Sequence, residues 1–236
     1  QELCTDIQSF FMLGSFGFAP EMTAPAISAL DIGNLDPAVA CLQEPLGVAI
    51  DMVRLADIRP GDNVLIMGAG TIGLMALALA KRAGAARVFV SQNPRRTARC
   101  ALARAWGADA IVTPEAVTAY DFGCSLQRIL VTAPPKALPD AFSVAAKAAI
   151  ISFIGIQHGP GATCSFDANA FHFKKLQLRA SFASPAMFGP RAIDLLRSGV
   201  IDGEALVTHR FPLEDVGDAV DTSRDSDAIK VVVEPN

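Results

Sequence analysis

The chain has 236 residues, a mass of 24.8 kDa and a formal net charge of −4, and its residues are 51% hydrophobic and 19% charged. This composition excludes a disordered chain, and the length allows one large domain or one domain with part of a second. The slight acidic excess argues against nucleic acid as a partner. We also expect no membrane partner, because three glycines divide the longest uncharged stretch, 63–80.

The number and spacing of the cysteines indicate whether the protein works in a reducing or an oxidising compartment. The five cysteines form no CxxC pair, and their odd number suits a reducing environment better than a disulfide scaffold. The first residues are acidic rather than basic and carry no A-x-A site, so they do not read as a signal peptide. We therefore expect a cytoplasmic protein.

The predicted elements alternate between helix and strand. Residues 1–38 are apolar and irregular, helical spacing runs from Pro37 to Val53, and Pro60-Gly61-Asp62 marks a turn. Strands are then expected at 63–67, 87–91, 110–113, 128–132, 149–154, 176–182, 206–211 and 229–233, and helices at 71–82, 94–106, 135–147, 190–198 and 213–222. This alternation predicts an α/β fold, a doubly wound parallel Rossmann sheet of six strands over about 55–185.

The strongest local motif is Gly68-Ala69-Gly70-Thr71-Ile72-Gly73, between a predicted strand and a predicted helix. Gly68 is expected to make the tight turn, Gly70 to let the backbone approach a pyrophosphate, and Gly73 to let helix and strand pack closely. The start of the helix adds N–H groups and a positive dipole end. The motif therefore predicts that these six residues bind a dinucleotide. The alternative is a tight turn without a ligand.

The end of the second strand bears on the choice of cofactor. Many dinucleotide sites have an acidic residue there, which accepts hydrogen bonds from the ribose hydroxyls. This chain has Ser91 and Gln92 instead, followed by Arg95 and Arg96. A 2′-phosphate would meet guanidinium groups and no carboxylate, so the sequence favours NADP over NAD. The alternative is that both arginines are solvated at a helix start, and that Ser91 and Gln92 bind only a ribose.

Six short stretches share their order and spacing with one known family. They are QEPL at 43–46, PGD at 60–62, the glycine motif, WGAD at 106–109, KKLQLRASF at 174–182 and THRFPLE at 208–214. Over about 200 residues the chain therefore resembles the zinc-dependent medium-chain dehydrogenases, the group of the sorbitol, xylitol and threonine dehydrogenases. The resemblance implies an NAD(P)-dependent oxidoreductase that transfers hydride between a secondary alcohol, such as a polyol, and the nicotinamide.

The resemblance also implies a domain division. Residues 1–45 would be a remnant of the GroES-like catalytic domain with the junction, 46–185 the NAD(P)-binding domain, and 186–236 a segment that returns to the catalytic domain. Most of the family's N-terminal catalytic domain would be missing. Family members form dimers or tetramers, so a homo-oligomer is expected.

Three further residues are assigned through the resemblance. Glu44 of the QEPL stretch would be a catalytic residue beside the catalytic zinc, either as a ligand or as a partner of the zinc-bound water, although a carboxylate at a helix start is an equally good interpretation. Cys4 would be the last thiolate of a structural zinc site, but its partners are missing, which favours an ordinary thiol. Lys230 would lie near the cofactor phosphates, or cap a terminal strand. Zinc is therefore expected in the intact family fold and not in this chain alone.

Two other functions stay open. One is a zinc-free quinone or enoyl reductase of the same superfamily, against which Glu-Pro-Leu at 44–46 argues. The other is a truncated module that binds the dinucleotide without turnover. One departure concerns 131–135, which reads VTAPP where many family members have a glycine, so the wall on the nicotinamide side is expected to differ.

Overall fold

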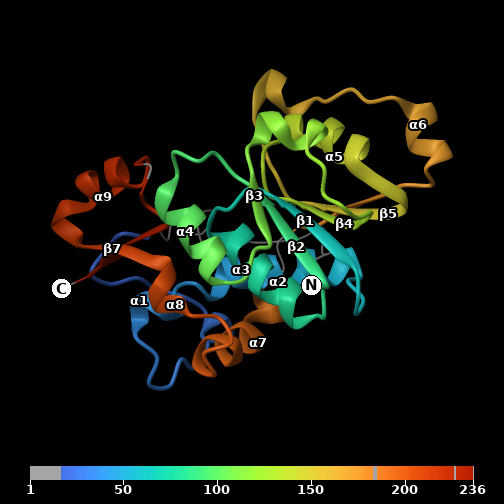
Figure 1. Cartoon of the computed structure of the whole chain (residues 1–236). Coiled ribbons are helices and arrows are strands. Elements are labelled where there is room, and N and C mark those ends of the chain that lie inside the picture. Colours follow the sequence, from blue (N-terminus) through green and yellow to red (C-terminus); the bar gives the residue numbers. More distant parts are fainter. Residues whose placement is uncertain (1–16, 183–184, 226, 236) are drawn as a thin grey trace. The chain divides into compact units, whose positions relative to one another are not determined.

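The structure is a computed structural model that describes residues 17–182, 185–225 and 227–235 (Figure 1). Two compact units make up the chain. One is Val48–Phe182, and the other combines Gln1–Gly47 with Ala183–Asn236. Among the described residues, no helix has both the length and the apolar character needed to cross a membrane.

The first unit, Val48–Phe182, is built on one sheet. Its strands are β1 (Asn63–Met67), β2 (Arg87–Ser91), β3 (Ala110–Val112), β4 (Leu126–Val131), β5 (Ala145–Phe153) and β6 (Gln177–Ala180). All neighbours are parallel, and the order is β3-β2-β1-β4-β5-β6. The prediction of a six-stranded, doubly wound parallel sheet is therefore confirmed. The strand order reverses between β1 and β4, which is where such sheets bind their ligands.

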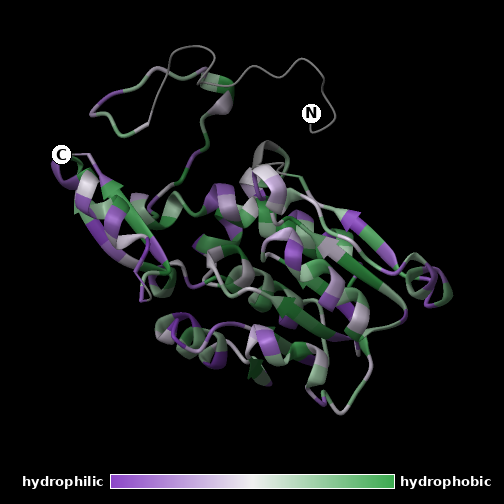
Figure 2. Ribbon diagram, turned by 90° about the horizontal axis from the view of Figure 1, so that it is seen from above, coloured by the Kyte–Doolittle hydropathy of each residue, from purple (hydrophilic) through white to green (hydrophobic). Residues whose placement is uncertain are grey.

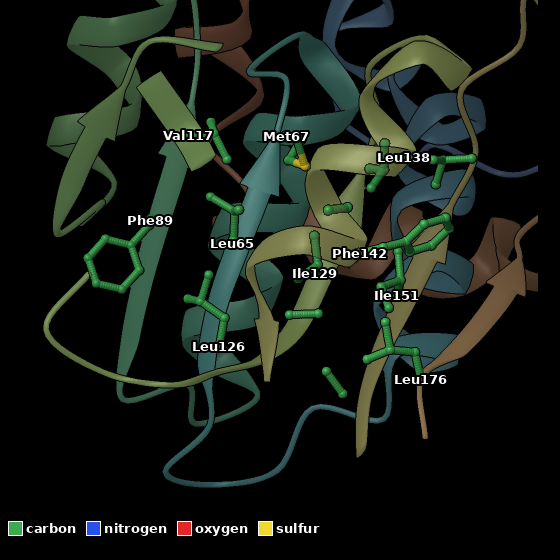
Figure 3. Close-up of a cluster of buried hydrophobic side chains, with 14 of the residues drawn as sticks. Leu65, Met67, Phe89, Val117, Leu126, Ile129, Leu138, Phe142, Ile151 and Leu176 are labelled. Atoms are coloured by element: carbon green, nitrogen blue, oxygen red, sulfur yellow. The ribbon is translucent and has the colours of Figure 1, made fainter. Parts of the chain in front are cut away.

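Both faces of this sheet are covered. Leu65 of β1 pairs with Phe89 of β2, and their side chains join Ile129 and Phe142 in a buried cluster on the face of α5 (Leu138–Val144), as Figure 3 shows. The opposite face carries the alternate residues of each strand and packs on α3 (Thr71–Arg82). Burial on both sides explains why the central strands β1 and β2 are nearly continuous apolar runs (Figure 2), whereas the edge strand β6 is largely exposed.

The remaining helical elements of this unit connect the strands. They are residues 48–56 of α2 (Gln43–Ala56), α4 (Thr97–Ala105), α6 (Ala168–Phe173) and the short 3₁₀ turns Pro114–Ala119, Pro135–Ala137 and Gly159–Ala162. One helix was expected from Pro37 to Val53. The structure has two, because α1 (Pro37–Ala40) ends before α2 begins at Gln43.

Two predicted helices of this unit are shorter in the structure. The helix expected at 94–106 begins only at Thr97, because the residues after Pro94 form a turn. The helix expected at 135–147 ends at Val144, and residues 145–147 belong to β5. The reason is a bulge, in which the pairing with β4 shifts register and Ala148 adopts a positive φ of 62°. Sheet pairing therefore overrides the helical preference of an alanine-rich stretch.

The second unit contains a two-stranded parallel sheet. Its elements are the 3₁₀ turn Ala26–Ser28, α1, α7 (Pro185–Arg197), α8 (Gly203–Leu206), β7 (Val207–Pro212), the 3₁₀ turn Leu213–Asp215, α9 (Val216–Thr222) and β8 (Lys230–Glu234). The helix expected at 190–198 begins at Pro185 instead and contains Pro190. The helix expected at 213–222 starts as a 3₁₀ turn and becomes α-helical at Val216.

Candidate functional site

The turn between β1 and α3 gives each of its three glycines a different task. Gly68 has a φ of +108°, a conformation that other residues rarely adopt, and a Cβ there would lie 2.6 Å from Oγ1 of Thr132. A Cβ on Gly73 would overlap the carbonyl oxygen of Gly68, so helix and turn touch at this point. A Cβ on Gly70 would meet no protein atom within 4 Å. The first and third glycines therefore serve the fold, and the space beside the second is open.

Hydrogen bonds hold this turn against its neighbouring strands. The N–H of Gly68 donates to the carbonyl oxygen of Ser91 at the end of β2 (2.9 Å). The N–H groups of Thr132 and Ala133, which follow β4, both donate to the carbonyl oxygen of Met67 (3.0 and 2.9 Å). Oγ1 of Thr132 lies 2.9 Å from the carbonyl oxygen of Gly68. The turn is thus fixed from both sides at the point where the strand order reverses.

The start of α3 is suited to an anion. Gly70 is the N-cap residue, and no side chain caps the helix there. The helix runs for 12 residues from this N-cap, so its positive dipole end lies at the glycine turn. Lys81 and Arg82 lie in its last turn, where the dipole is negative. Pyrophosphates bind at such helix starts because backbone N–H groups point toward them. The two observations together, an open Gly70 and an uncapped helix start, fit a dinucleotide.

A cavity of about 380 Å³ lies beside this turn, at the carboxyl ends of β1 to β4. Its lining includes Gly68, Ser91 and Gln92, which the sequence predicts as cofactor contacts. The other lining residues end β1, follow β3 or β4, or belong to α5, and they are Met67, Pro114, Glu115, Ala133, Pro134, Lys136, Ala137 and Asp140. The cavity therefore occupies the place where doubly wound sheets take their ligands.

Two lining segments have well-defined packing. Ser91 is buried, with 3% of its surface exposed. The N–H of Gln92 donates to the carbonyl oxygen of Val112, which connects the ends of β2 and β3. On the other side, a Cβ on Gly155 would overlap the carbonyl oxygen of Ala133, so the chain after β5 presses directly on the cavity wall. These contacts join the end of β2 to the end of β3, and the segment after β5 to the segment after β4.

Sequence reasoning missed three charged residues of this cavity, Glu115, Lys136 and Asp140. None of them belongs to a recognisable motif. Glu115 and Lys136 do, however, come within a few residues of the ends of β3 and β4, and the carboxyl ends of parallel strands meet at one edge. That position was the only available signal.

The predicted arginines lie next to the cavity segment of β2 rather than in its lining. Arg95 is exposed, and its N–H donates to Oδ1 of Asn93 (2.9 Å). Arg96 is the N-cap residue of α4. Burial and, next, the charge of Arg96 lower the pKa of the Arg99 guanidinium, so a third cation stands close to the same loop. Among the described residues, neither Arg95 nor Arg96 lines the cavity.

The other predicted residues are distributed over the chain. Ala69, Thr71 and Ile72 complete the turn and the first turn of α3. Glu44 is an exposed residue in the first turn of α2, and Lys230 begins β8, so both belong to the second unit. The prediction for Cys4 lies outside the described residues.

The donor groups needed for a metal are not gathered in the described part of the chain. Residues 17–182, 185–225 and 227–235 contain no group of three or more His, Cys, Asp or Glu side chains placed to hold a metal ion. Tetrahedral zinc needs three or four protein ligands. The described residues by themselves therefore do not fit zinc.

A comparison with protein families decides the assignment. The family model described as zinc-binding dehydrogenase matches residues 71–198, which is more than half of the chain. The chain belongs to the zinc-binding dehydrogenase family. This membership confirms the resemblance seen in the sequence motifs, and it agrees with the Rossmann architecture.

Individual relatives are similar over most of this chain. An L-arabinitol 4-dehydrogenase of Aureobasidium melanogenum is 32% identical and aligns with 89% of the chain and 59% of its own length. A solved Escherichia coli alcohol dehydrogenase in complex with NADH is 27% identical, with a TM-score of 0.77 over 88% of this chain and 63% of that one. A Sinorhizobium meliloti protein described as a zinc-binding dehydrogenase and bound to NADP is 27% identical, with a TM-score of 0.76 over 85% and 60%.

These dehydrogenase relatives are longer than the chain. The chain spans between 48% and 69% of the length of eight curated relatives that it matches.

Proposed function

We propose that this chain is the dinucleotide-binding part of an NAD(P)-dependent alcohol dehydrogenase, which transfers hydride between a secondary alcohol and the nicotinamide. The observation that carries the proposal is the β1–α3 turn. Gly68 and Gly73 are required by the protein's own packing, whereas Gly70 leaves open space next to an uncapped helix start. The polyol substrate class is supported by the name of the L-arabinitol relative.

The turn and the end of β2 bind different parts of the cofactor. Residues 68–73 hold the pyrophosphate through backbone N–H groups and the helix dipole. Ser91 and Gln92, at the end of β2, contact the adenosine ribose. The nicotinamide, when bound, supplies the hydride acceptor. This chain's residues bind and orient that cofactor.

The preference for NADP is a finer part of the proposal. Gln92 offers the ribose a neutral amide instead of a carboxylate, and Arg95 and Arg96 stand on the loop that follows it. A relative solved with NADP and another solved with NADH have the same fold, so the family accommodates both cofactors.

The rest of the proposal concerns the whole protein. Residues 1–45 and 186–236 belong to a catalytic domain, residues 46–185 to the cofactor domain, and Glu44 stands beside the catalytic metal of the intact fold. The protein works in the cytoplasm as a homo-oligomer, on a small alcohol. Sedimentation at micromolar concentration measures the assembly, and a monomer would contradict it.

The phosphate site is tested by Gly70→Val. Its side chain enters the space meant for the pyrophosphate, so binding of NADPH and NADH should weaken about a hundredfold or more while the melting temperature stays near that of the wild type. Nucleotide fluorescence measures the binding. Gly217→Val is the matched control, because a Cβ there also meets no protein atom and lies in the other unit. A folded Gly70→Val chain that binds normally would refute the site.

A second candidate is a module that binds the cofactor without turnover. It is favoured by the position of the dinucleotide-binding turn and of the cavity, which both lie within the single compact unit Val48–Phe182. Titration with NADPH, together with assays of alcohol oxidation in the presence of added zinc, separates the two. Cofactor binding without any hydride transfer identifies the module, and turnover identifies the enzyme.

A further inference from the structure

The cavity at the carboxyl ends of the strands contains one ammonium group and two carboxylates. Lys136 belongs to the 3₁₀ turn after β4, Glu115 to the turn after β3, and Asp140 to α5. Within the described structure, none of the three side chains makes an ion pair or a hydrogen bond, although all three line the same space. Their charges are therefore available to a ligand.

The position of Lys136 relative to the ribose site is the decisive point. In doubly wound sheets, the adenosine ribose lies at the end of the second strand, which here is Gln92. Gln92 lines the cavity together with Lys136, whereas Arg95 and Arg96 do not line it. A phosphate on the ribose 2′-oxygen that pointed into this cavity would share it with Lys136.

We propose that Lys136 is the residue that recognises the 2′-phosphate of NADP(H), and that it sets the cofactor preference from the loop after β4. The inference rests on the proposed dinucleotide function and names the residue that determines its specificity. Lysine suits the task, because its ammonium is a compact charge with three donors on a flexible stem, and Lys136 is exposed.

The two carboxylates increase the effect that Lys136 should have on the cofactor preference. Glu115 and Asp140 suit the donors of adenosine, its amino group and its hydroxyls, but their charges oppose a phosphate. With Lys136 present, the cavity holds charges of both signs, as an adenosine 2′-phosphate requires. Without Lys136, its formal charge is purely negative, and unphosphorylated adenosine should be preferred.

The experiment uses two probes that differ only in the 2′-phosphate, adenosine 2′,5′-bisphosphate and AMP. Their dissociation constants are measured by calorimetry at fixed moderate salt. The variants are Lys136→Ala and Lys136→Arg, with Arg95→Ala/Arg96→Ala as the rival. Lys147→Ala is the matched control, because Lys147 is an exposed lysine near the amino end of β5, away from the carboxyl ends of the strands.

Lys136→Ala should weaken binding of the bisphosphate about tenfold, which corresponds to about 1.4 kcal/mol, and change AMP binding less than about twofold. Lys136→Arg should keep most of the preference, and Lys147→Ala all of it. If Lys136→Ala leaves the ratio of the dissociation constants for the bisphosphate and AMP unchanged, the inference is overturned. Loss of the preference for the bisphosphate in the Arg95→Ala/Arg96→Ala variant would then assign the 2′-phosphate to the arginines. Failure of the proposed function looks different, since the wild-type chain would then bind neither AMP, NADH nor NADPH.

Discussion

The hydroxyl of Ser152 lies inside the sheet with no exposed surface and no hydrogen-bond partner in the described structure. Ser181, near the end of β6, is also buried, but its hydroxyl donates to Oδ2 of Asp51 at 2.6 Å. A buried polar group without a partner costs free energy because it has lost its hydrogen bonds to water. The two serines therefore allow the free energy of burying a hydroxyl to be compared with and without a hydrogen-bond partner.

Replacing them by alanine should change stability in opposite directions. Ser152→Ala should raise the free energy of unfolding by about 1 kcal/mol, because it removes an unsatisfied group. Ser181→Ala should lower it by about 1 to 3 kcal/mol, because it leaves the buried carboxylate of Asp51 with one partner fewer. Urea denaturation with unchanged m-values measures both. If Ser152→Ala destabilises the protein, the hydroxyl has a partner, such as a buried water.

At the scale of single residues, the sequence predicts those residues whose role depends on spacing along the chain. The three glycines of the β1–α3 turn have distinct roles that follow from their order along the chain. Lys136 and Glu115 escape prediction, because what matters is which strands are neighbours in the sheet. That order is a property of the fold, and no local pattern around either residue encodes it.

Among the elements, α3, β2 and the approach to β3 are joined through one carboxylate. Oδ2 of Asp109 accepts from Nζ of Lys81 at 2.8 Å, and from the N–H of Val88 at 2.7 Å. Partial burial acts to raise the pKa of Asp109, but the hydrogen bonds from Lys81 and Val88 outweigh it, so the pKa lies below its usual value. The ionised form of Asp109 is thus favoured by folding.

Asp109→Ala should therefore destabilise the chain in a pH-dependent way. Above the unfolded pKa of about 4 the loss should be about 1 kcal/mol, and it should shrink as the pH falls through the lower pKa of the folded state. Urea denaturation at pH 7, 5 and 3 gives the comparison. Asp121→Ala is the control, since Asp121 is exposed and makes no ion pair in the described structure. A loss for Asp109→Ala that is independent of pH would show that its charge is immaterial.

The sequence predicts the type of each element better than it predicts where the element begins and ends. The alternation of apolar runs and helical spacing is enough to predict all six strands of the larger sheet. It fails at residues 145–147, where alanine and lysine favour a helix but Lys174 changes the outcome. Nζ of Lys174 donates to the carbonyl oxygens of Phe142, Ser143 and Ala145, so the last turn of α5 is satisfied there and the chain enters β5.

At the scale of the whole molecule, the candidate cofactor site and the residue predicted to lie beside the family's zinc belong to different units of the chain. Turn, cavity and strand ends that suit a dinucleotide all lie within Val48–Phe182. Glu44 lies in the other unit, where the clearest charge cluster is structural. Arg210 there pairs with Asp36, Glu204 and Glu234.

The purified chain should consequently bind NADPH without holding stoichiometric zinc. Three or four ligands are needed for a tight zinc site, and among the described residues no such set is close together. After incubation with zinc and gel filtration, metal analysis should give well under one zinc per chain, and NADPH affinity should be the same with and without a chelator. Glu44→Gln should leave both values unchanged. One zinc per chain that is lost in Glu44→Gln would show that Glu44 and further residues form a metal site, and the chain would then contain part of the catalytic centre as well as the cofactor site.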